Sequence, residues 1–487
     1  MVKSKRGTSV DKYQELKFSY NKLLSSEGVS KGDVRAYVGL LTAIRETELS
    51  QKGVSGKPAH IRAFEYALDK LKVTLRKGNL VGAVEEQAEK WRREGQKKEE
   101  ASSSKRAEEA ILPPPIPNIK DWGGDGLSLV SLFSGALGLD LGFLAAGFDM
   151  KYANDIEEDS KETVEKNLPK VPFGLGDFGK IDNEEVLETT GLKRGELDVL
   201  TGGPPCQPFS TAGKRQGLND PRSSPLTDFI QAIEDMQPKA FVMEEVTGLK
   251  SARLKHVPIK DRDRELEPEE QKGSVFDEIL DMFDSTGYDY IYDTVNAANY
   301  GSPQKRRRLI FIGLRDGEPN MPKETNAPNP KNKLIGGNDA DPWRTFWEAT
   351  ADLSEKSMNS ASLSGKKEYM ELVPPAGYWR HLPDNKVKEA MGGAYNSGGG
   401  RMGYFRRLSW DEPTPTVVTS PNQKSTMLGH PERLRPLSVE EYKRIQGFPD
   451  DWEIEGSLSG QYKLIGNAVP VHLSYEIAKH VKKILSG

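Results

Sequence analysis

The stretch GGPPCQPFS, residues 202–210, contains Cys206, the single cysteine among 487 residues. Thiols, with an ordinary pKa of about 8.5, become strong and soft nucleophiles once they are partly ionised. A lone cysteine can also serve as a small buried hydrophobe. However, the residues that follow, STAGKRQGLNDPRSS, are polar and glycine-rich, which argues against burial. The pattern therefore favours a nucleophile whose loop is stiffened by the prolines on either side.

Two further groups of residues could assist such a nucleophile. Glu244 and Glu245 end the apolar run AFVMEEV, and strand alternation sends them to opposite faces. One is expected to enter a site as a proton-holding acid, while the other is left to solvent. At the entry to RLIFIGL, the same alternation turns Arg306 and Arg308 to one side, where they suit phosphate or carbonyl oxygen.

A separate set of residues predicts a nucleoside site. The turn FSGALGLDLG (133–142) follows the apolar run LSLVSLF, and its glycines allow a ligand to approach backbone N–H groups. Asp155, after the second strand, can accept hydrogen bonds from both ribose hydroxyls. Asp177, after the third, can accept one from an exocyclic amine. Because the first turn has no basic residue for a pyrophosphate, a nucleoside without a diphosphate is favoured, and S-adenosylmethionine is the common one.

Most of these residues end or follow runs that read as strands, and the two arginines stand at the start of one. LSLVSLF, MKYAND, LDVLTGG, AFVMEEV and RLIFIGL are short and apolar, and several are separated by helical stretches. This order predicts an α/β protein with a doubly wound sheet, whose sites form at the carboxyl ends of the strands. Residues 251–274 are too charged for a core and predict a surface insertion. Residues 319–430 lose the alternation and predict a loop-rich second domain.

Composition and charge limit the remaining possibilities. One cysteine excludes an intrachain disulfide and a zinc site built on several cysteines, and we expect no metal. No apolar run approaches the length of a membrane span, which favours the cytoplasm. Residues 11–95 read as helices, and 94–118 as a linker. Residues 1–110 hold 23 Lys+Arg and 16 Asp+Glu, a net +7, which leaves −11 for residues 111–487 of the total of −4.

Together these motifs closely resemble the DNA (cytosine-5) methyltransferases of the bacterial restriction–modification type. The resemblance runs from about residue 127 to 480, in the motif order of the family. Leu137 stands where the family often has glycine, and Glu245 replaces the asparagine of a Glu-Asn-Val motif. The matching stretches are SLFSGALGLDLGF, GGPPCQPFS, DPRSSPL, MEEV, QKRRR, RRLSWDEPTPTVVTSP and GNAVP.

The resemblance implies an architecture of three parts. A methyltransferase sheet of residues 118–318, completed by 458–487, would bind S-adenosylmethionine. Residues 319–457 would form a smaller target-recognition domain and hinge, and residues 1–117 an N-terminal helical domain with its linker. The expected cofactor-binding residues are Phe133, Ser134, Gly135, Asp155, Ile156, Asp177, Phe178, Pro204, Asn467 and Ala468.

The resemblance also implies a reaction. Cys206 would add to C6 of a cytosine flipped out of double-stranded DNA, and Glu244 would act on N3. Arg308 would reach the flipped base or its phosphate, with Arg306 beside it. The enzyme would act as a monomer on nucleoid DNA, and a cognate restriction endonuclease would be its functional partner.

Three alternatives remain. An RNA cytosine-5 methyltransferase shares the nucleophile motif, but that branch carries an added Cys-Phe-Thr motif that a chain with one cysteine cannot contain. Non-catalytic DNA-binding regulators usually lose the nucleophile, whereas Cys206 and Glu244 are both present. The N-terminal domain could repress its own operon. It shows no clear recognition helix, which favours a plain helical accessory domain.

Overall fold

A computed structural model describes residues 126–205, 224–255, 257–258, 262–328, 340–354, 358–363, 365–396 and 401–487. Cys206, and the helices and linker expected in residues 1–117, lie outside these described residues. Within the described ranges, no helix is long and apolar enough to cross a bilayer. In the same part of the chain, no three His, Cys, Asp or Glu side chains gather as they would around a metal ion.

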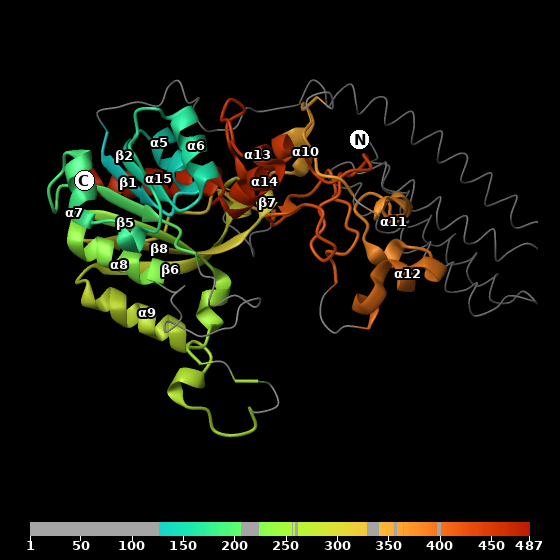
Figure 1. The fold of residues 1–487 in the computed structure, drawn as a ribbon, viewed down its shortest axis with the longest axis horizontal. Coiled ribbons are helices and arrows are strands. Elements are labelled where there is room, and N and C mark those ends of the chain that lie inside the picture. Colours follow the sequence, from blue (N-terminus) through green and yellow to red (C-terminus); the bar gives the residue numbers. More distant parts are fainter. Residues whose placement is uncertain are drawn as a thin grey trace, which may run out of the picture.

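The centre of the molecule is a seven-stranded sheet in the order β3-β2-β1-β4-β5-β8-β6 (Figure 1). β8 runs antiparallel to its neighbours β5 and β6, and the other pairs are parallel. The doubly wound sheet predicted from the sequence is thus confirmed, whereas the reversed strand was not expected. Residues 297–306 alone join β6 to β8, and a parallel connection needs roughly a dozen residues or more. The strands are β1 (Ser128–Leu132), β2 (Asp149–Asp155), β3 (Phe173–Leu175), β4 (Val199–Gly202), β5 (Ala240–Val246), β6 (Asp289–Asn296) and β8 (Arg307–Leu314).

Helices cover both faces of this sheet (Figure 1). Strand alternation sends Leu129 to one core cluster and Val130 to the other, and Val242 and Phe241 divide in the same way. Because both faces are buried there, β5 and β8 contain uninterrupted apolar stretches, AFVM and LIFIGL, whereas β6 at the edge of the sheet carries polar residues. The first face packs against α5 (Gly138–Ala145), α6 (Glu158–Asn167) and α15 (Val471–Leu485), and the second against α7 (Asn183–Thr190), α8 (Ser224–Met236) and α9 (Ser274–Ser285).

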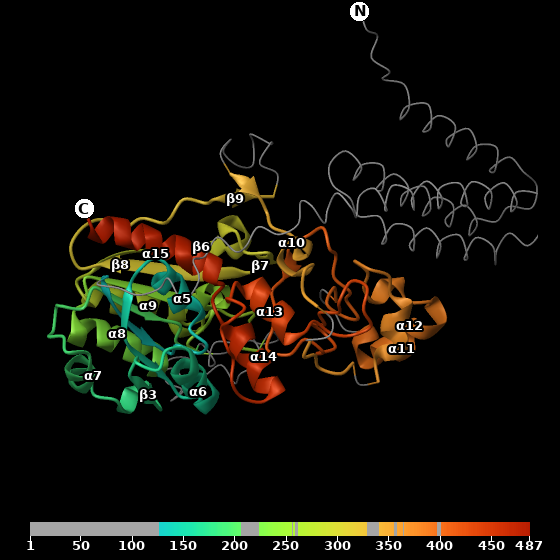
Figure 2. The ribbon, with the colours of Figure 1, turned by 90° about the horizontal axis from the view of Figure 1, so that it is seen from above.

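Helices α5 and α15 lie side by side although they are far apart in the sequence (Figure 2). A Cβ on Gly142 would overlap the backbone of Ser474, and one on Gly138 would lie 2.6 Å from the Val469 carbonyl oxygen. The Ser474 hydroxyl donates a hydrogen bond to the Gly138 carbonyl at 3.1 Å. These two glycines of the GLDLG stretch therefore serve close helix packing.

Most of the remaining described residues form a loop-rich region. Part of it has its own core, which includes Met370, Trp379, Phe405 and Met427, and we call residues 363–427 around this core the small lobe. Its helices α11 and α12 lie at the end of the molecule opposite the sheet in both views (Figures 1 and 2). The helices of this region are α10 (Phe346–Thr350), α11 (Lys367–Leu372), α12 (Asp384–Met391), α13 (Val439–Gln446) and α14 (Leu458–Asn467), and its short strands are β7 (Gln304–Lys305), β9 (Asn326–Ala327), β10 (Asp341–Pro342) and β11 (Thr414–Pro415).

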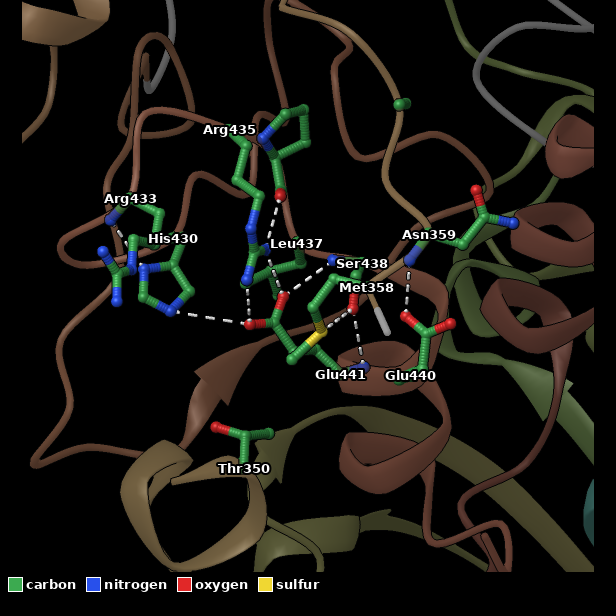
Figure 3. A network of polar contacts seen from close by, with 12 residues as sticks. Thr350, Met358, Asn359, His430, Arg433, Arg435, Leu437, Ser438, Glu440 and Glu441 are labelled. Atoms are coloured by element: carbon green, nitrogen blue, oxygen red, sulfur yellow. Dashed lines mark hydrogen bonds and ion pairs between the residues drawn. The ribbon is translucent and has the colours of Figure 1, made fainter. Parts of the chain in front are cut away.

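A buried carboxylate fastens the segment before α13 to that helix (Figure 3). Glu441 accepts both terminal guanidinium nitrogens of Arg435, at 2.8 and 2.9 Å, and the backbone N–H of Ser438 at 2.7 Å. His430 lies beside it, and its Nδ1 accepts the backbone N–H groups of Glu432 and Arg433. Burial and the neighbouring arginines lower the pKa of His430 to about 3, so this ring is neutral.

Candidate active site

An ion pair between Glu244 and Arg308 lies at the carboxyl end of β5. The Arg308 Nε lies 2.5 Å from the Glu244 Oε1, and both side chains are largely buried. The antiparallel register places Arg308 opposite Val246. Glu244 is two residues from Val246 and points to the same face, so the two charged side chains are diagonal neighbours. The structure thus brings together two of the residues that the sequence singled out.

The same carboxylate lies against the segment that leads to Cys206. A Cβ on Gly203 would lie 3.5 Å from the Glu244 Oε2. Gly203 follows β4, whose last residue Gly202 pairs with Met243 next to Glu244. Gly202 itself has no room for a side chain, because its Cβ would lie 2.5 Å from the Phe229 ring. Strand pairing therefore brings the acid beside Gly203, in the described segment that precedes Cys206 in the sequence.

Glu245 points to the opposite face, as alternation predicts, but the expectation that it faces solvent is wrong. Its side chain is buried, with 2 % of the residue exposed, and one carboxylate oxygen accepts its neighbour's N–H, that of Val246, at 3.0 Å. The reason is that β5 lies inside a sheet covered by helices on both faces. Neither face of such a strand reaches water.

Arg306 is buried close to Arg308, but its terminal nitrogens bind the backbone of other segments. It donates hydrogen bonds to the carbonyl oxygens of Val417, Gly466 and Asn467, at 3.0 to 3.1 Å. Burial, with a smaller contribution from Arg308, lowers the pKa of Arg306 to about 9. This geometry favours a role in holding these segments together over contact with a base or phosphate.

The expected cofactor residues gather at the carboxyl edge of β1, β2 and β3. The Gly135 N–H donates to the Asp155 carboxylate at 2.8 Å, and Ser134 donates to the Asn154 carbonyl. Phe133 packs edge-on against Phe178, with ring centroids 6.0 Å apart. Because these strands are parallel, their carboxyl ends lie at one edge of the sheet, and the turns that follow the three strands lie close together there.

The turn after β1 is conformationally unusual. Phe133, Gly135 and Leu137 have φ values of +55°, +53° and +65°. Glycine adopts this region freely, whereas it costs other residues roughly 1–2 kcal/mol. Leu137 occupies the place where the resemblance leads one to expect glycine, and it is completely buried. Its apolar burial offsets the backbone strain.

The opposite wall comes from the end of α14. Gly138 lies so close to Ala468 that its Cβ would be 2.7 Å from the Ala468 Cβ. Asn467 ends α14 immediately before it. Pro204, which follows β4, is buried, and Asp177 is partly exposed with Lys180 at 3.4 Å. The structure thus places all the expected cofactor residues around the same edge of the sheet.

The donors and acceptors at this edge fit a nucleoside. The Asp155 carboxylate is held by the N–H groups of Gly135 and Glu157, and burial raises its pKa. Next to it, Ile156 is 66 % exposed, an unusual state for a large apolar residue that an aromatic base could cover. An anchored acceptor beside an exposed apolar side chain suits a ribose with its base.

Sequence analysis missed one polar group behind this site. Asp140, in the first turn of α5, is buried and accepts the Thr201 hydroxyl at 2.6 Å. Burial raises the pKa of Asp140 to about 6. The only signal was an aspartate in the otherwise apolar stretch ALGLDLGF.

Comparison with known proteins supports the same interpretation. Residues 127–483 match the family model of the C-5 cytosine-specific DNA methylases. The chain is 37 % identical over 356 residues to the type II methyltransferase M.Sau96I of Staphylococcus aureus, covering 73 % of this chain and 75 % of that protein. It is 37 % identical over 363 residues to M.Eco47II of Escherichia coli, covering 74 % and 79 %. With M.PspPI of a Psychrobacter species the identity is 38 % over 362 residues, covering 74 % and 80 %. The chain therefore belongs to the C-5 cytosine-specific DNA methylases, whose methyl donor is S-adenosylmethionine.

Proposed function

We propose that Cys206 and Glu244 carry out covalent methylation of a flipped cytosine in a specific duplex sequence, with Arg308 holding the acid in place. The observation that carries this proposal is the 2.5 Å pair between Arg308 and Glu244. Its carboxylate lies beside Gly203, three positions before Cys206 in the sequence. A thiol and an acid from neighbouring strand ends suit nucleophilic addition to a nitrogen-containing ring, because the acid can act on the ring nitrogen.

The chemistry requires both groups. C5 of cytosine is a weak nucleophile, and it cannot be reached inside the base stack. The Cys206 sulfur would form a bond to C6, and the displaced electrons would move toward N3, where Glu244 supplies a hydrogen bond or a proton. S-adenosylmethionine supplies an electrophilic methyl group to C5. Loss of the C5 proton then restores the double bond and expels the Cys206 thiolate.

The nucleophile can be tested directly. Cys206→Ser should abolish methyl transfer and leave DNA binding measurable, because a serine hydroxyl is a far weaker nucleophile than a thiolate. A duplex with 5-fluorocytosine should trap the wild-type enzyme covalently, since fluorine cannot leave as a proton, and Cys206→Ser should form no such adduct. Normal methylation by Cys206→Ser would end the proposal.

The acid has a matched control in its neighbour. Glu244→Gln should lower kcat by roughly 10²–10⁴, the range typical of acid–base groups. Glu245→Gln should lower it much less, because that side chain points to the other face of β5. Single-turnover rates on one duplex would compare the two variants. Equal losses would remove the reason for giving them different roles.

We also propose that the enzyme protects host DNA, as a monomer on nucleoid DNA, from a cognate restriction endonuclease. Support comes from relatives that are named type II methyltransferases. Sequencing the methylated bases of a host that expresses the protein would give the target sequence. An endonuclease that cuts that sequence should then fail on the host DNA. A family model of DNA methylases does not favour the RNA enzyme or the non-catalytic regulator.

A further inference from the structure

Two buried glutamines join four segments through a continuous row of hydrogen bonds. The Val417 N–H donates to the Gln304 Oε1 at 2.8 Å, and the Gln304 Nε2 donates to the Gln446 Oε1, also at 2.8 Å. The Gln446 Nε2 then donates to the carbonyl oxygens of Ile465 and Ala468, at 2.6 and 2.9 Å. Both glutamine residues are completely inaccessible to solvent.

Arg306, two positions after Gln304, connects Val417 and the end of α14 a second time. Its guanidinium donates to the carbonyl oxygens of Val417, Gly466 and Asn467. The backbones are in direct contact as well, since a Cβ on Gly466 would lie 2.6 Å from the Val418 carbonyl carbon. Little room therefore remains for one segment to shift against the other.

The joined segments belong to different parts of the machinery. Residues 465–468 include the expected cofactor residues Asn467 and Ala468, and Ala468 lies against Gly138. Residues 408–417 form the stem of the small lobe, because Leu408 and Val417 pack in the core beside the sheet whereas Phe405 and Met427 pack in the core of the lobe. Gln304 itself lies in β7, four positions before Arg308.

This arrangement makes independent movement costly. Separating the stem from the pocket wall would leave buried amide groups without hydrogen bonds, at a cost of about 1–3 kcal/mol for each group. A ligand that fixes residues 465–468 therefore also restricts the stem. By reciprocity, a partner that fixes the small lobe restricts the pocket wall.

We propose that Gln304 and Gln446 are positioning residues that couple occupancy of the cofactor pocket to DNA binding by the small lobe. This inference rests on the proposed function, in which the protein recognises a specific sequence of double-stranded DNA. It predicts positive coupling between the two ligands. The first ligand already orders the joined segments, so the second binds without the entropy cost of ordering them. The quantity that expresses it is the ratio of the DNA Kd without cofactor to that with cofactor.

The test measures this ratio with the full-length protein. A fluorescent duplex that contains the methylation site is titrated with and without saturating S-adenosylhomocysteine, which has no methyl group to transfer. The wild-type ratio should be about 5 or more, the usual lower range of such coupling. Gln446→Met and Gln304→Met keep much of the side-chain shape but lose the hydrogen bonds, and each should bring the ratio close to 1.

Gln461→Met is the matched control. Gln461 lies on α14 and donates to the Ile454 carbonyl at 2.9 Å, so the variant loses a comparable bond without touching the stem. Its ratio should equal that of the wild type. Because the readout is a ratio of two affinities, a smaller folded fraction alone does not change it, and Gln304→Met tests the same row should Gln446→Met fail to fold.

The outcomes separate this inference from the proposed function. Site-specific binding and methylation with an unchanged ratio in both variants would overturn the coupling role alone, as would a wild-type ratio of 1. A wild-type protein that binds no duplex at all would overturn the proposed function and the coupling with it. A ratio that falls equally in Gln461→Met would reduce the two glutamines to general packing.

Discussion

Asp140 shows how burial sets the charge of a single residue behind the cofactor loop. Its side chain lies in the first turn of α5 and accepts the Thr201 hydroxyl at 2.6 Å. Removal from water disfavours the carboxylate, which is why its pKa rises from 3.8 to about 6. The folded protein therefore holds this proton more tightly than the unfolded chain does.

Asp140→Asn should stabilise the protein at pH 8 and lose most of this advantage by pH 4. The raised pKa contributes stability below about pH 4, and this stability is lost as the pH rises through about 6. Above that range, a shift of about 2 units costs the wild type roughly 3 kcal/mol. Asparagine carries no charge and still accepts the Thr201 hydroxyl. Urea unfolding of both proteins at pH 4 and pH 8 would measure the difference in stability, and a difference that does not change with pH would contradict the assignment.

The sequence predicts which residues belong to the site better than it predicts what those residues contact. Strand alternation separated Glu244 from Glu245 and grouped Arg308 with Arg306, and the resemblance to the family then singled out Glu244 and Arg308. Arg306 was grouped with them by the same alternation, yet its partners are backbone carbonyls more than a hundred positions away. No local pattern contains such partners, since they depend on where α14 and the stem of the small lobe fold back.

At the scale of elements, a clamp joins α6 to the segment before α14. The Asn167 amide donates to the Glu453 carbonyl at 2.7 Å and accepts the Glu453 N–H at 2.9 Å. The Thr163 hydroxyl accepts the Glu455 N–H at 3.0 Å. Helix α6 follows Ile156, and α14 ends at Asn467, so the clamp sets the distance between two walls of the cofactor pocket.

Asn167→Ala should raise the KM for S-adenosylmethionine about 3- to 10-fold and leave kcat nearly unchanged. Each lost hydrogen bond weakens the clamp by roughly 1 kcal/mol, while the catalytic groups on β5 and β8 are untouched. Lys166→Ala is the control, because its exposed ion pair with Glu453, at 3.4 Å, contributes little. Steady-state kinetics at saturating DNA would compare the two. A fall in kcat without a change in KM would show that the clamp does not act on the pocket.

The sheet itself was predictable because short apolar runs, glycine-rich turns and helices alternate along the chain. Its reversed strand β8 was not, because direction depends on the length of a connection that the sequence shows only as NAANYGSPQK. The placement of α15 against α5 was equally hidden. Gly138 and Gly142 looked like ligand-binding glycines, and only the neighbouring helix shows that they permit close packing.

On the scale of the whole molecule, charge is divided between two parts of the chain. Residues 1–110 carry a net +7 and residues 111–487 a net −11. DNA attracts the first part and repels the second, apart from basic residues that are gathered locally. The first part lies outside the described residues, and its role stays a prediction from sequence.

Deleting residues 1–117 should weaken binding to any DNA sequence and leave the methylated sequence unchanged. Each phosphate contact adds roughly −0.9 to the slope of log affinity against log salt, so the truncated protein should show a flatter slope. Affinities over a salt series would measure it, with thermal unfolding as a check on folding. An unchanged slope would assign the segment another task, such as self-association, and a new methylation site would show that it reads sequence.

The packing of α15 on α5 has a consequence for how the enzyme is made. Ser474 and Gly138 are 336 positions apart, and between them the ribosome must synthesise nearly everything else that the structure describes. The cofactor loop therefore emerges early but cannot acquire its partner wall until residues 467–485 follow. A nascent chain stopped before that point would expose the apolar side of α5 and bind no methyl donor. We therefore expect activity only after residues 467–485 have been synthesised, and no methylation from chains that stop before them.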